Sequence, residues 1–273
     1  MKYLLILSIV FLTISSCDNN TKPQITANGD SLQVCDFGIQ KEDFSKEQRD
    51  SSFTLFARGR KIKNPPPPPP PPAPVVYKPG VILLDFDGHT VTGTNWNTSG
   101  DLVCSPSGLS IDEQQVVLDS VASKYRIFNV IVTTLDSSYN AAPANKRIRL
   151  IFTQTYEWFG MSGGVAFIGS FTWGNNTPCF VFTSLLGYNS KKILEAGTHE
   201  VGHSLGLYHQ SVYDSIPAYP GTRISEYNSG CCGFAPIMGL SYYQPMSQWI
   251  TGWNASKQVQ DDINKISLIL PKR

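Results

Sequence analysis

The sequence is poor in histidine and has no excess of charge of either sign. It contains four histidines in 273 residues, and its 22 basic side chains nearly balance 21 acidic ones. This balance gives no support for nucleic-acid binding, which requires a clustered basic surface. There is no internal repeat and no glycine-rich phosphate loop, and the apolar run over residues 3–14 is too short to span a bilayer comfortably.

Three of the four histidines lie together in the segment 199–209, which reads HEVGHSLGLYH. Histidines four residues apart on a helix point from one face, so His199 and His203 can reach one metal ion. Gly206 can take the left-handed conformation that ends a helix, and the chain can then turn back to bring in His209. Three protein ligands leave the fourth position of a tetrahedral zinc ion to water, which predicts a catalytic Zn²⁺ site.

Glu200 follows the first of these histidines and can take a proton from such a water molecule. Two other interpretations explain less. A structural zinc would need a fourth cysteine or histidine at a suitable spacing, and a metal-free helix with two core histidines leaves Glu200 without a role. Once the three histidines are assigned to metal, no Ser-His-Asp arrangement remains in the chain.

The motif predicts a helix of about four turns that starts at a cap on Asn189 or Ser190 and ends at Gly206. Three apolar residues of this segment fall roughly opposite His199 and His203 at 100° per residue. They are Leu194, Val201 and Leu205. We therefore expect one helix face to pack in the core and the other to face a cleft.

The motif resembles that of the metzincin zinc endopeptidases, and so does the segment 235–239, Ala-Pro-Ile-Met-Gly. Metzincins have a tight turn here whose methionine lies beneath the metal, and we call residues 235–239 the Met-turn. The resemblance implies that Met238 is a floor of the site and not a ligand. Some metzincins carry a tyrosine two residues further on, but this chain has Leu240 there, and Tyr242 and Tyr243 come later.

The family resemblance and the pattern together imply an α+β fold: a mixed, mostly parallel twisted sheet with an antiparallel edge strand, the zinc helix, and a smaller C-terminal subdomain. The periodicity predicts strands at 81–86, 130–134, 147–153, 165–173 and 179–183, a helix opened by a capping box at Ser110, and a closing helix over 257–268. In metzincins an extended substrate lies antiparallel to the edge strand. Here that strand is 165–173, and Gly163 and Gly164 give it room.

The N-terminal third is organised differently from the rest. Residues 1–16 resemble an export signal, and Cys17 completes a segment similar to a bacterial lipobox, which implies lipidation of Cys17. An ordinary secretory signal is the alternative. Residues 17–64 are a polar N-terminal segment, disordered or acting as a pro-segment, and 65–77 form a proline-rich linker that favours a semi-rigid polyproline II spacer. We place the catalytic domain at 78–273.

The remaining cysteines and one acidic loop suggest possible disulfides, a latency residue and a calcium site, each on weaker grounds than the zinc motif. Cys231 and Cys232 can each pair with a distant cysteine, Cys104 and Cys179 being candidates. Cys35 is a candidate latency residue, although a lone cysteine is more often incidental. Near the end of the first strand, Asp85, Asp87 and His89 can hold Ca²⁺ or simply make local hydrogen bonds.

From these features we expect a zinc-dependent endopeptidase that cleaves peptide bonds of extracytoplasmic proteins, with Glu200 as general base. The alternative is a non-cleaving, zinc-containing surface lipoprotein that binds a host or envelope partner. We expect a monomer, anchored by lipid to the outer membrane or cell surface of a bacterium or released from it.

Overall fold

The computed structural model describes residues 78–216 and 219–273. The predicted signal (1–16), the segment 17–64 with Cys17 and Cys35, and the linker (65–77) lie outside the described residues, so these predictions stay untested. Within the described ranges, none of the helices combines the length and the apolar character needed to cross a bilayer.

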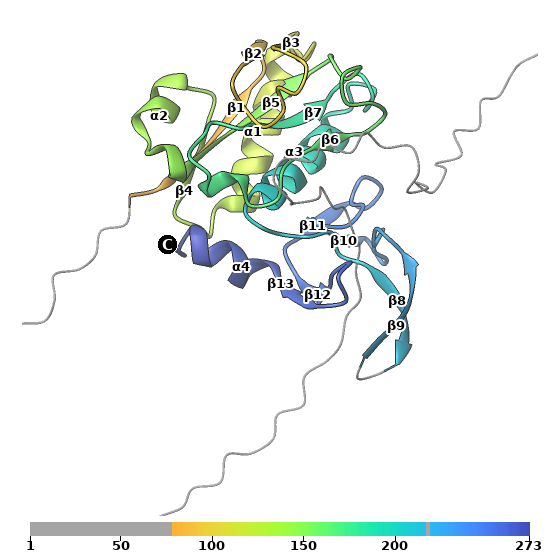
Figure 1. Cartoon of the computed structure of the whole chain (residues 1–273). Coiled ribbons are helices and arrows are strands. Elements are labelled where there is room, and N and C mark those ends of the chain that lie inside the picture. Colours follow the sequence, from red (N-terminus) through yellow and green to blue (C-terminus); the bar gives the residue numbers. More distant parts are fainter. Residues whose placement is uncertain (1–77, 217–218) are drawn as a thin grey trace, which may run out of the picture. The chain divides into compact units, whose positions relative to one another are not determined.

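A five-stranded sheet in the order β4-β1-β5-β7-β6 forms the centre of the domain (Figure 1). Its strands are β1 Gly80–Asp85, β4 Val130–Thr133, β5 Arg147–Thr153, β6 Gly164–Val165 and β7 Cys179–Phe182. All neighbours run parallel except β6, which runs antiparallel to β7. Strands β1 and β7 are buried at every residue, as expected for strands covered on both faces. The predicted mixed sheet with an antiparallel edge is thus confirmed.

The edge strand itself is much shorter than the sequence predicts. Instead of 165–173, only Gly164–Val165 pairs with β7, and a 3₁₀ turn, η2 (Ser170–Thr172), takes up part of the remainder. Gly169 has a φ of 81°, which is incompatible with an extended strand. Phe167 and Phe171 are both buried, so packing of these two rings overrides the β propensity of the segment.

Two long helices cover one face of the sheet. They are α1 (Ile111–Tyr125) and α3 (Ser190–Ser204), and they also pack against each other. The capping box of α1 is present as predicted: Ser110 accepts from the backbone N–H of Glu113, and the Glu113 carboxylate accepts from that of Ser110. The main core lies between these helices and the sheet and includes Ile82, Leu84, Leu150, Phe152, Val181, Val117, Val121, Tyr125, Ile193 and Val201.

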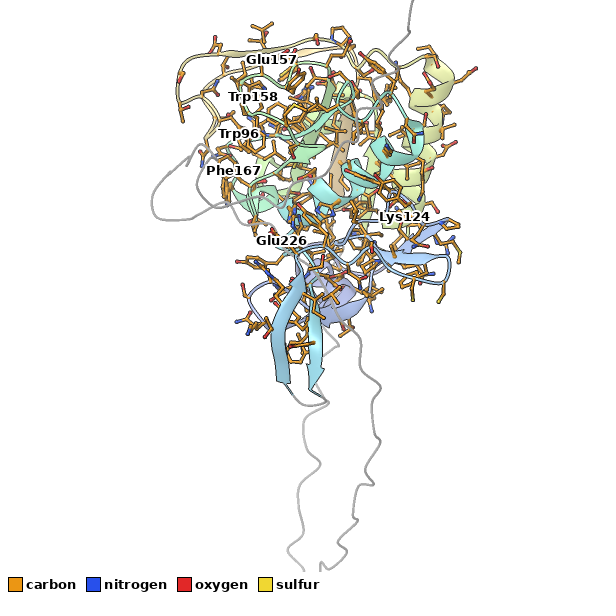
Figure 2. All side chains as sticks on the ribbon, turned by 90° about the vertical axis from the view of Figure 1, so that its right-hand side faces the viewer. Trp96, Lys124, Glu157, Trp158, Phe167 and Glu226 are labelled. Carbon is orange, nitrogen blue, oxygen red and sulfur yellow. The ribbon has the colours of Figure 1, made fainter. Side chains whose placement is uncertain are left out.

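Shorter elements and aromatic side chains cover the opposite face. The short helix α2 (Asp136–Ala141) places Tyr139 against Val81 and Leu83. A hairpin of β2 (His89–Val91) and β3 (Leu102–Cys104) and the 3₁₀ turn η1 (Ala144–Lys146) are the other elements of this part of the chain. Trp96, Trp158 and Phe167 lie close together in Figure 2, and the Trp96 ring centroid is 4.1 Å from that of Phe167.

The chain after α3 forms small two-stranded sheets and one helix, drawn in shades of blue below the main sheet in Figure 1. The pairs are β8 (Val212–Ile216) with β9 (Tyr219–Ser225), β10 (Phe234–Pro236) with β11 (Met246–Gln248), and β12 (Thr251–Trp253) with β13 (Val259–Asp261). This matches the predicted C-terminal subdomain. The closing helix α4, however, spans only Asp262–Ile269, because residues 251–261 form a hairpin with Lys257 at a φ of 57° in its turn.

Specific hydrogen bonds fix this C-terminal part to the helices. The Lys124 ammonium at the end of α1 donates to the Ser247 carbonyl at 2.6 Å, and the Trp249 indole donates to the Lys124 carbonyl at 2.9 Å; Lys124 is labelled in Figure 2. From α3, the buried Glu195 carboxylate accepts from the hydroxyls of Ser241 and Ser247. Both helices therefore hold the segment that follows the Met-turn.

The predicted long-range disulfides are absent among the described cysteines. Cys104 and Cys179 are buried and free, and Cys231 and Cys232 are exposed and free. Cys104 and Cys179 are strand residues whose side chains pack in the interior, whereas the other two lie in the turn before β10. The prediction that pairs them is therefore wrong.

Candidate metal centre

Helix α3 carries the first part of the motif and is more deeply buried than the sequence predicts. Asn189 caps its start by accepting from the Lys192 backbone N–H at 3.0 Å. Every residue from Ile193 to Ser204 is buried, with His199 8 % and Glu200 7 % exposed. The expected open face is thus nearly closed, because the Met-turn packs against the histidine-bearing side of the helix while the sheet and α1 take the other side.

The two helical histidines are oriented through their Nδ1 atoms. His199 Nδ1 lies 2.8 Å from the carbonyl oxygen of Ile237 in the Met-turn, and His203 Nδ1 lies 2.8 Å from that of Leu207. A carbonyl can only accept, so each Nδ1 carries the hydrogen and each Nε2 keeps its lone pair. This is the support that metal-binding histidines have in proteins, where an outer hydrogen bond fixes the tautomer and the ring orientation.

The helix ends as the motif predicts, and its end brings in the third histidine. Gly206 has a φ of 87°, and the backbone N–H groups of Gly206 and Leu207 donate back to the carbonyls of His203 and Gly202. The chain turns after this cap, so that the Nε2 atoms of His203 and His209 point at each other.

Together, the three buried histidines form the one cluster of potential metal ligands found among the described residues, with ligand atoms within 4.8 Å of one another. Burial lowers the pKa of His199 to about 4 and that of His203 well below its usual value. Both imidazoles are therefore neutral near pH 7, the form that binds metal. Neutral imidazoles with fixed Nε2 lone pairs fit a zinc ion with three protein ligands.

The side chain of Glu200, on helix α3, lies next to the edge strand β6. A methyl group built on Gly164 of β6 would approach the Glu200 Cγ to 2.8 Å and its Oε1 to 2.9 Å. Only a glycine lets the β6 backbone come this close to the carboxylate. Burial also raises the pKa of Glu200 well above its usual value, which makes this carboxylate a stronger proton acceptor.

Met238 lies under the helix, as the family resemblance implies. Its side chain is fully buried, and a methyl group built on Gly202 would come within 2.5 Å of its Sδ. The Met238 carbonyl accepts from the backbone N–H of Gln210, the residue after the third histidine, at 2.9 Å. The Met-turn thus contacts helix α3 at Gly202 and the residue after the motif, Gln210.

Two tyrosines lie near this site, and sequence reasoning missed the first. The ring centroid of Tyr227 is 4.6 Å from that of His209 and 6.5 Å from that of His199. Its neighbour Glu226, labelled in Figure 2, immediately follows strand β9. Tyr242 lies near the edge strand, because a methyl group on Gly163 would meet its hydroxyl at 2.6 Å. No periodic pattern marks Tyr227, so the sequence gives no signal for it.

The acidic loop after β1 is an ion-paired cluster rather than a calcium site. The Asp85 carboxylate pairs with the Arg149 guanidinium, which also binds Asp136. His89 Nδ1 lies 3.6 Å from the same Asp85 oxygen. Burial raises the pKa of Asp85 to about 6 despite the opposing effect of Arg149. A guanidinium already occupies the position that a cation would need, and Ca²⁺ has no support here.

A comparison with known protein families agrees with this geometry. Residues 119–210 match a family model described as metallo-peptidase family M12B, reprolysin-like, and no curated protein matches the chain. The matched segment runs from within α1 to just beyond His209, so the Met-turn adds an observation outside it. The match and the three-histidine cluster fit a metzincin-type zinc metalloprotease, a metalloendopeptidase.

Proposed function

We propose that the protein is a zinc-dependent endopeptidase that hydrolyses peptide bonds of extracytoplasmic proteins, with Glu200 as general base. The observation that carries this proposal is the convergence of His199, His203 and His209 beside Glu200. His199, His203 and His209 would hold the ion. When bound, zinc supplies a Lewis acid and lowers the pKa of a coordinated water molecule to about 7.

Glu200 then has two proton transfers to perform. Its carboxylate accepts one proton from the water molecule as the water oxygen bonds to the carbonyl carbon of the peptide. It passes that proton to the nitrogen as the C–N bond breaks, which releases a carboxylic acid and an amine; near pH 7 the acid then gives its proton to the amine. In this proposal the substrate main chain lies along β6, which is supported by the closeness of Gly164 to Glu200. Backbone groups at a sheet edge can bind an extended substrate main chain whatever its side chains.

We further propose that Cys17 anchors the protein by lipid outside the cytoplasm and that substrates are proteins found there. This rests on the sequence of residues 1–17 alone. Growth of the expressing bacterium with a labelled fatty acid should label the wild-type chain but leave the Cys17→Ser variant unlabelled. Equal labelling of the two chains would exclude Cys17 as the lipidated residue.

The experiment that tests the enzyme compares the full chain with its Glu200→Gln variant, each loaded with zinc, on a proteome-derived peptide library. Mass spectrometry maps the cleavage sites, and metal analysis reports the zinc content. We expect cleavage by the wild type only and one zinc ion per chain in both proteins, because Glu200 transfers protons and ligates nothing.

The alternative is a surface lipoprotein that binds zinc and a partner without cleaving. A folded, zinc-loaded wild type that cuts no peptide in the library and no denatured protein would favour this alternative. Appreciable cleavage by the Glu200→Gln variant would remove Glu200 from the role of general base.

A further inference from the structure

His209 is held differently from the two histidines of the zinc helix. It lies on the loop that follows the Gly206 cap, so no helical hydrogen bonds fix its backbone. Its carbonyl accepts from the backbone N–H of Ala255 at 3.3 Å. The hydrogen bonds of its two neighbours, Tyr208 and Gln210, add to this contact in fixing the loop that carries His209.

The residue before His209 is held by one side-chain amide from β13. Gln260 Oε1 accepts from the backbone N–H of Tyr208 at 3.0 Å, and Gln260 Nε2 donates to the Tyr208 carbonyl at 2.8 Å. Both main-chain groups of Tyr208 are thus bound by the same amide. Gln260 is 1 % exposed, so water does not compete for these bonds.

The residue after His209 is held at its main chain and at its side chain. Gln210 donates its backbone N–H to the Met238 carbonyl and accepts from the Asn228 N–H at 3.1 Å. Its side-chain Nε2 donates to Asp262 Oδ1 at 2.6 Å. Gln210 is fully buried, and its side chain reaches the first turn of α4.

Both amides meet at one carboxylate. Asp262 Oδ1 accepts from Gln210 Nε2 and from Gln260 Nε2, the second at 3.0 Å, while Oδ2 accepts from the Ile250 N–H at 3.2 Å. Asp262 is fully buried and takes part in none of the ion pairs between described residues. Burial raises the pKa of Asp262 to about 7, which shows that an ionised side chain at this position destabilises the fold.

The chemistry of the three donors explains why a carboxylate occupies the position. Three N–H groups from three different segments point at two oxygens, and a carboxyl group has acceptor lone pairs on both of its oxygens. An asparagine has one acceptor oxygen, and its NH₂ group would face at least one of these donors. A buried donor left without an acceptor is destabilising, so the network favours an acid at this position.

We propose that Asp262 is a positioning residue for the third metal ligand: through Gln210 and Gln260 it fixes the backbone on both sides of His209. This inference rests on the proposed zinc binding by the three histidines. Asp262 touches neither metal nor substrate. It acts across about fifty residues of sequence, from the closing helix to the loop that carries His209.

The test compares the zinc affinity of the full chain with that of Asp262→Asn and Asp261→Asn. Asp261 is the matched control, since it is the exposed neighbour that caps α4 by accepting from the Asn264 N–H, and asparagine also caps helices well. Competition with a chromogenic chelator, without substrate, gives the zinc dissociation constant. We expect binding about tenfold or more weaker for Asp262→Asn, in the range for loss of outer contacts of a metal ligand, and unchanged within about twofold for Asp261→Asn.

A second readout separates positioning from general stability. We expect Asp262→Asn to lower kcat at saturating zinc with little change in KM, because the geometry of the ligands changes while the substrate-binding edge does not. Gln260→Ala removes the bonds to Tyr208 and should weaken zinc binding too. A double-mutant cycle of positions 260 and 262 should then show non-additive losses, since both changes break one network.

Each outcome of these measurements either supports or overturns the proposed role of Asp262. A folded Asp262→Asn variant with the zinc affinity of Asp261→Asn overturns the inference. If Asp262→Asn does not fold, Gln260→Ala decides: weaker zinc binding supports the inference, and unchanged binding overturns it. A wild-type chain that fails to bind zinc overturns the proposed function itself, together with what rests on it.

Discussion

The sulfur of Met238 lies so close to Gly202 that a single methyl group on the glycine would approach it to 2.5 Å. Gly202 is on the zinc helix between Glu200 and His203, and Met238 is in the Met-turn. The contact explains why the helix carries a residue without a side chain here although glycine weakens helices. The Met-turn can approach the metal-binding part of the helix only because this Cβ is missing.

Gly202→Ala should therefore destabilise the protein although alanine favours helices. The added methyl group overpacks the contacts with Met238 and Trp249, at a cost of about 1–3 kcal/mol. Urea unfolding of the full chain measures the change. Gly206→Ala serves as the comparison without overpacking. A methyl group on Gly206 meets nothing within 4 Å, so this change strains only the backbone at its positive φ. A Gly202→Ala protein as stable as the wild type would contradict the close contact.

Gly164→Ala should lower activity while zinc stays bound. Its methyl group would meet the Glu200 side chain and the Phe180 carbonyl, so that Glu200 or strand β6 has to move. A displacement of about 1 Å at a reacting group can cost about 100-fold in rate. The measurement is kcat/KM together with zinc content.

Gly163→Ala serves as control for that change. Its methyl group meets the Tyr242 hydroxyl and Leu186 instead of Glu200, so we expect a smaller loss of kcat/KM. Equal kcat/KM in Gly164→Ala and the wild type would show that the edge strand does not constrain the carboxylate.

Asp262 should make stability depend on pH in a direction opposite to that of an ordinary ion-paired aspartate. Its pKa is about 7 in the folded protein, against the ordinary value of 3.8 in the unfolded chain. Between these values the folded state binds the extra proton, so the free energy of unfolding falls as pH rises. This favourable contribution is complete below pH 3.8 and is lost as the pH rises through about 7.

Urea unfolding at several pH values between 4 and 8, with a chelator present throughout, measures this effect against Asp262→Asn. The wild type should lose stability relative to the variant as pH rises, since every other titratable side chain is common to both proteins. Parallel curves for the two proteins would show that Asp262 has an ordinary pKa.

Thiol reactivity should divide the described cysteines into two classes. Cys231 and Cys232 are exposed, whereas burial raises the pKa of Cys104 to about 12 and that of Cys179 well above its usual value. Because the thiolate is the reactive form, an alkylating reagent should modify the exposed pair in the native protein and the buried pair only on unfolding. Peptide mapping after alkylation tests this, and rapid native labelling of Cys179 would contradict its burial.

The sequence predicts those parts of the site that depend on local geometry. Helical spacing relates His199 to His203, and the left-handed Gly206 brings the chain back, because both follow from positions a few residues apart. The order of elements along the chain and a mostly parallel sheet with an antiparallel edge strand also follow from apolar periodicity together with the family resemblance. These predictions are confirmed by the structure.

The parts that could not be predicted depend on contacts between distant segments. The edge strand is shorter than predicted because Phe167 and Phe171 pack in the interior. The β propensity of a segment does not reveal such long-range packing. Tyr227 reaches His209 from the end of a hairpin, and Asp262 reaches Gln210 from the closing helix. Single polar residues of this kind have no period, so their roles appear only once the chain is folded.

The buried bonds from Gln260 and Asp262 to the His209 loop imply an order in which the site matures. A chain that has emerged only as far as Gln210 already contains His199, His203 and His209, yet it lacks Gln260 and Asp262, whose bonds hold the residues on both sides of His209. The arrangement around His209 is thus completed by residues that are synthesised about fifty positions after it. A protease assembled in this way has no finished active site while its own chain is still unfolded and cleavable.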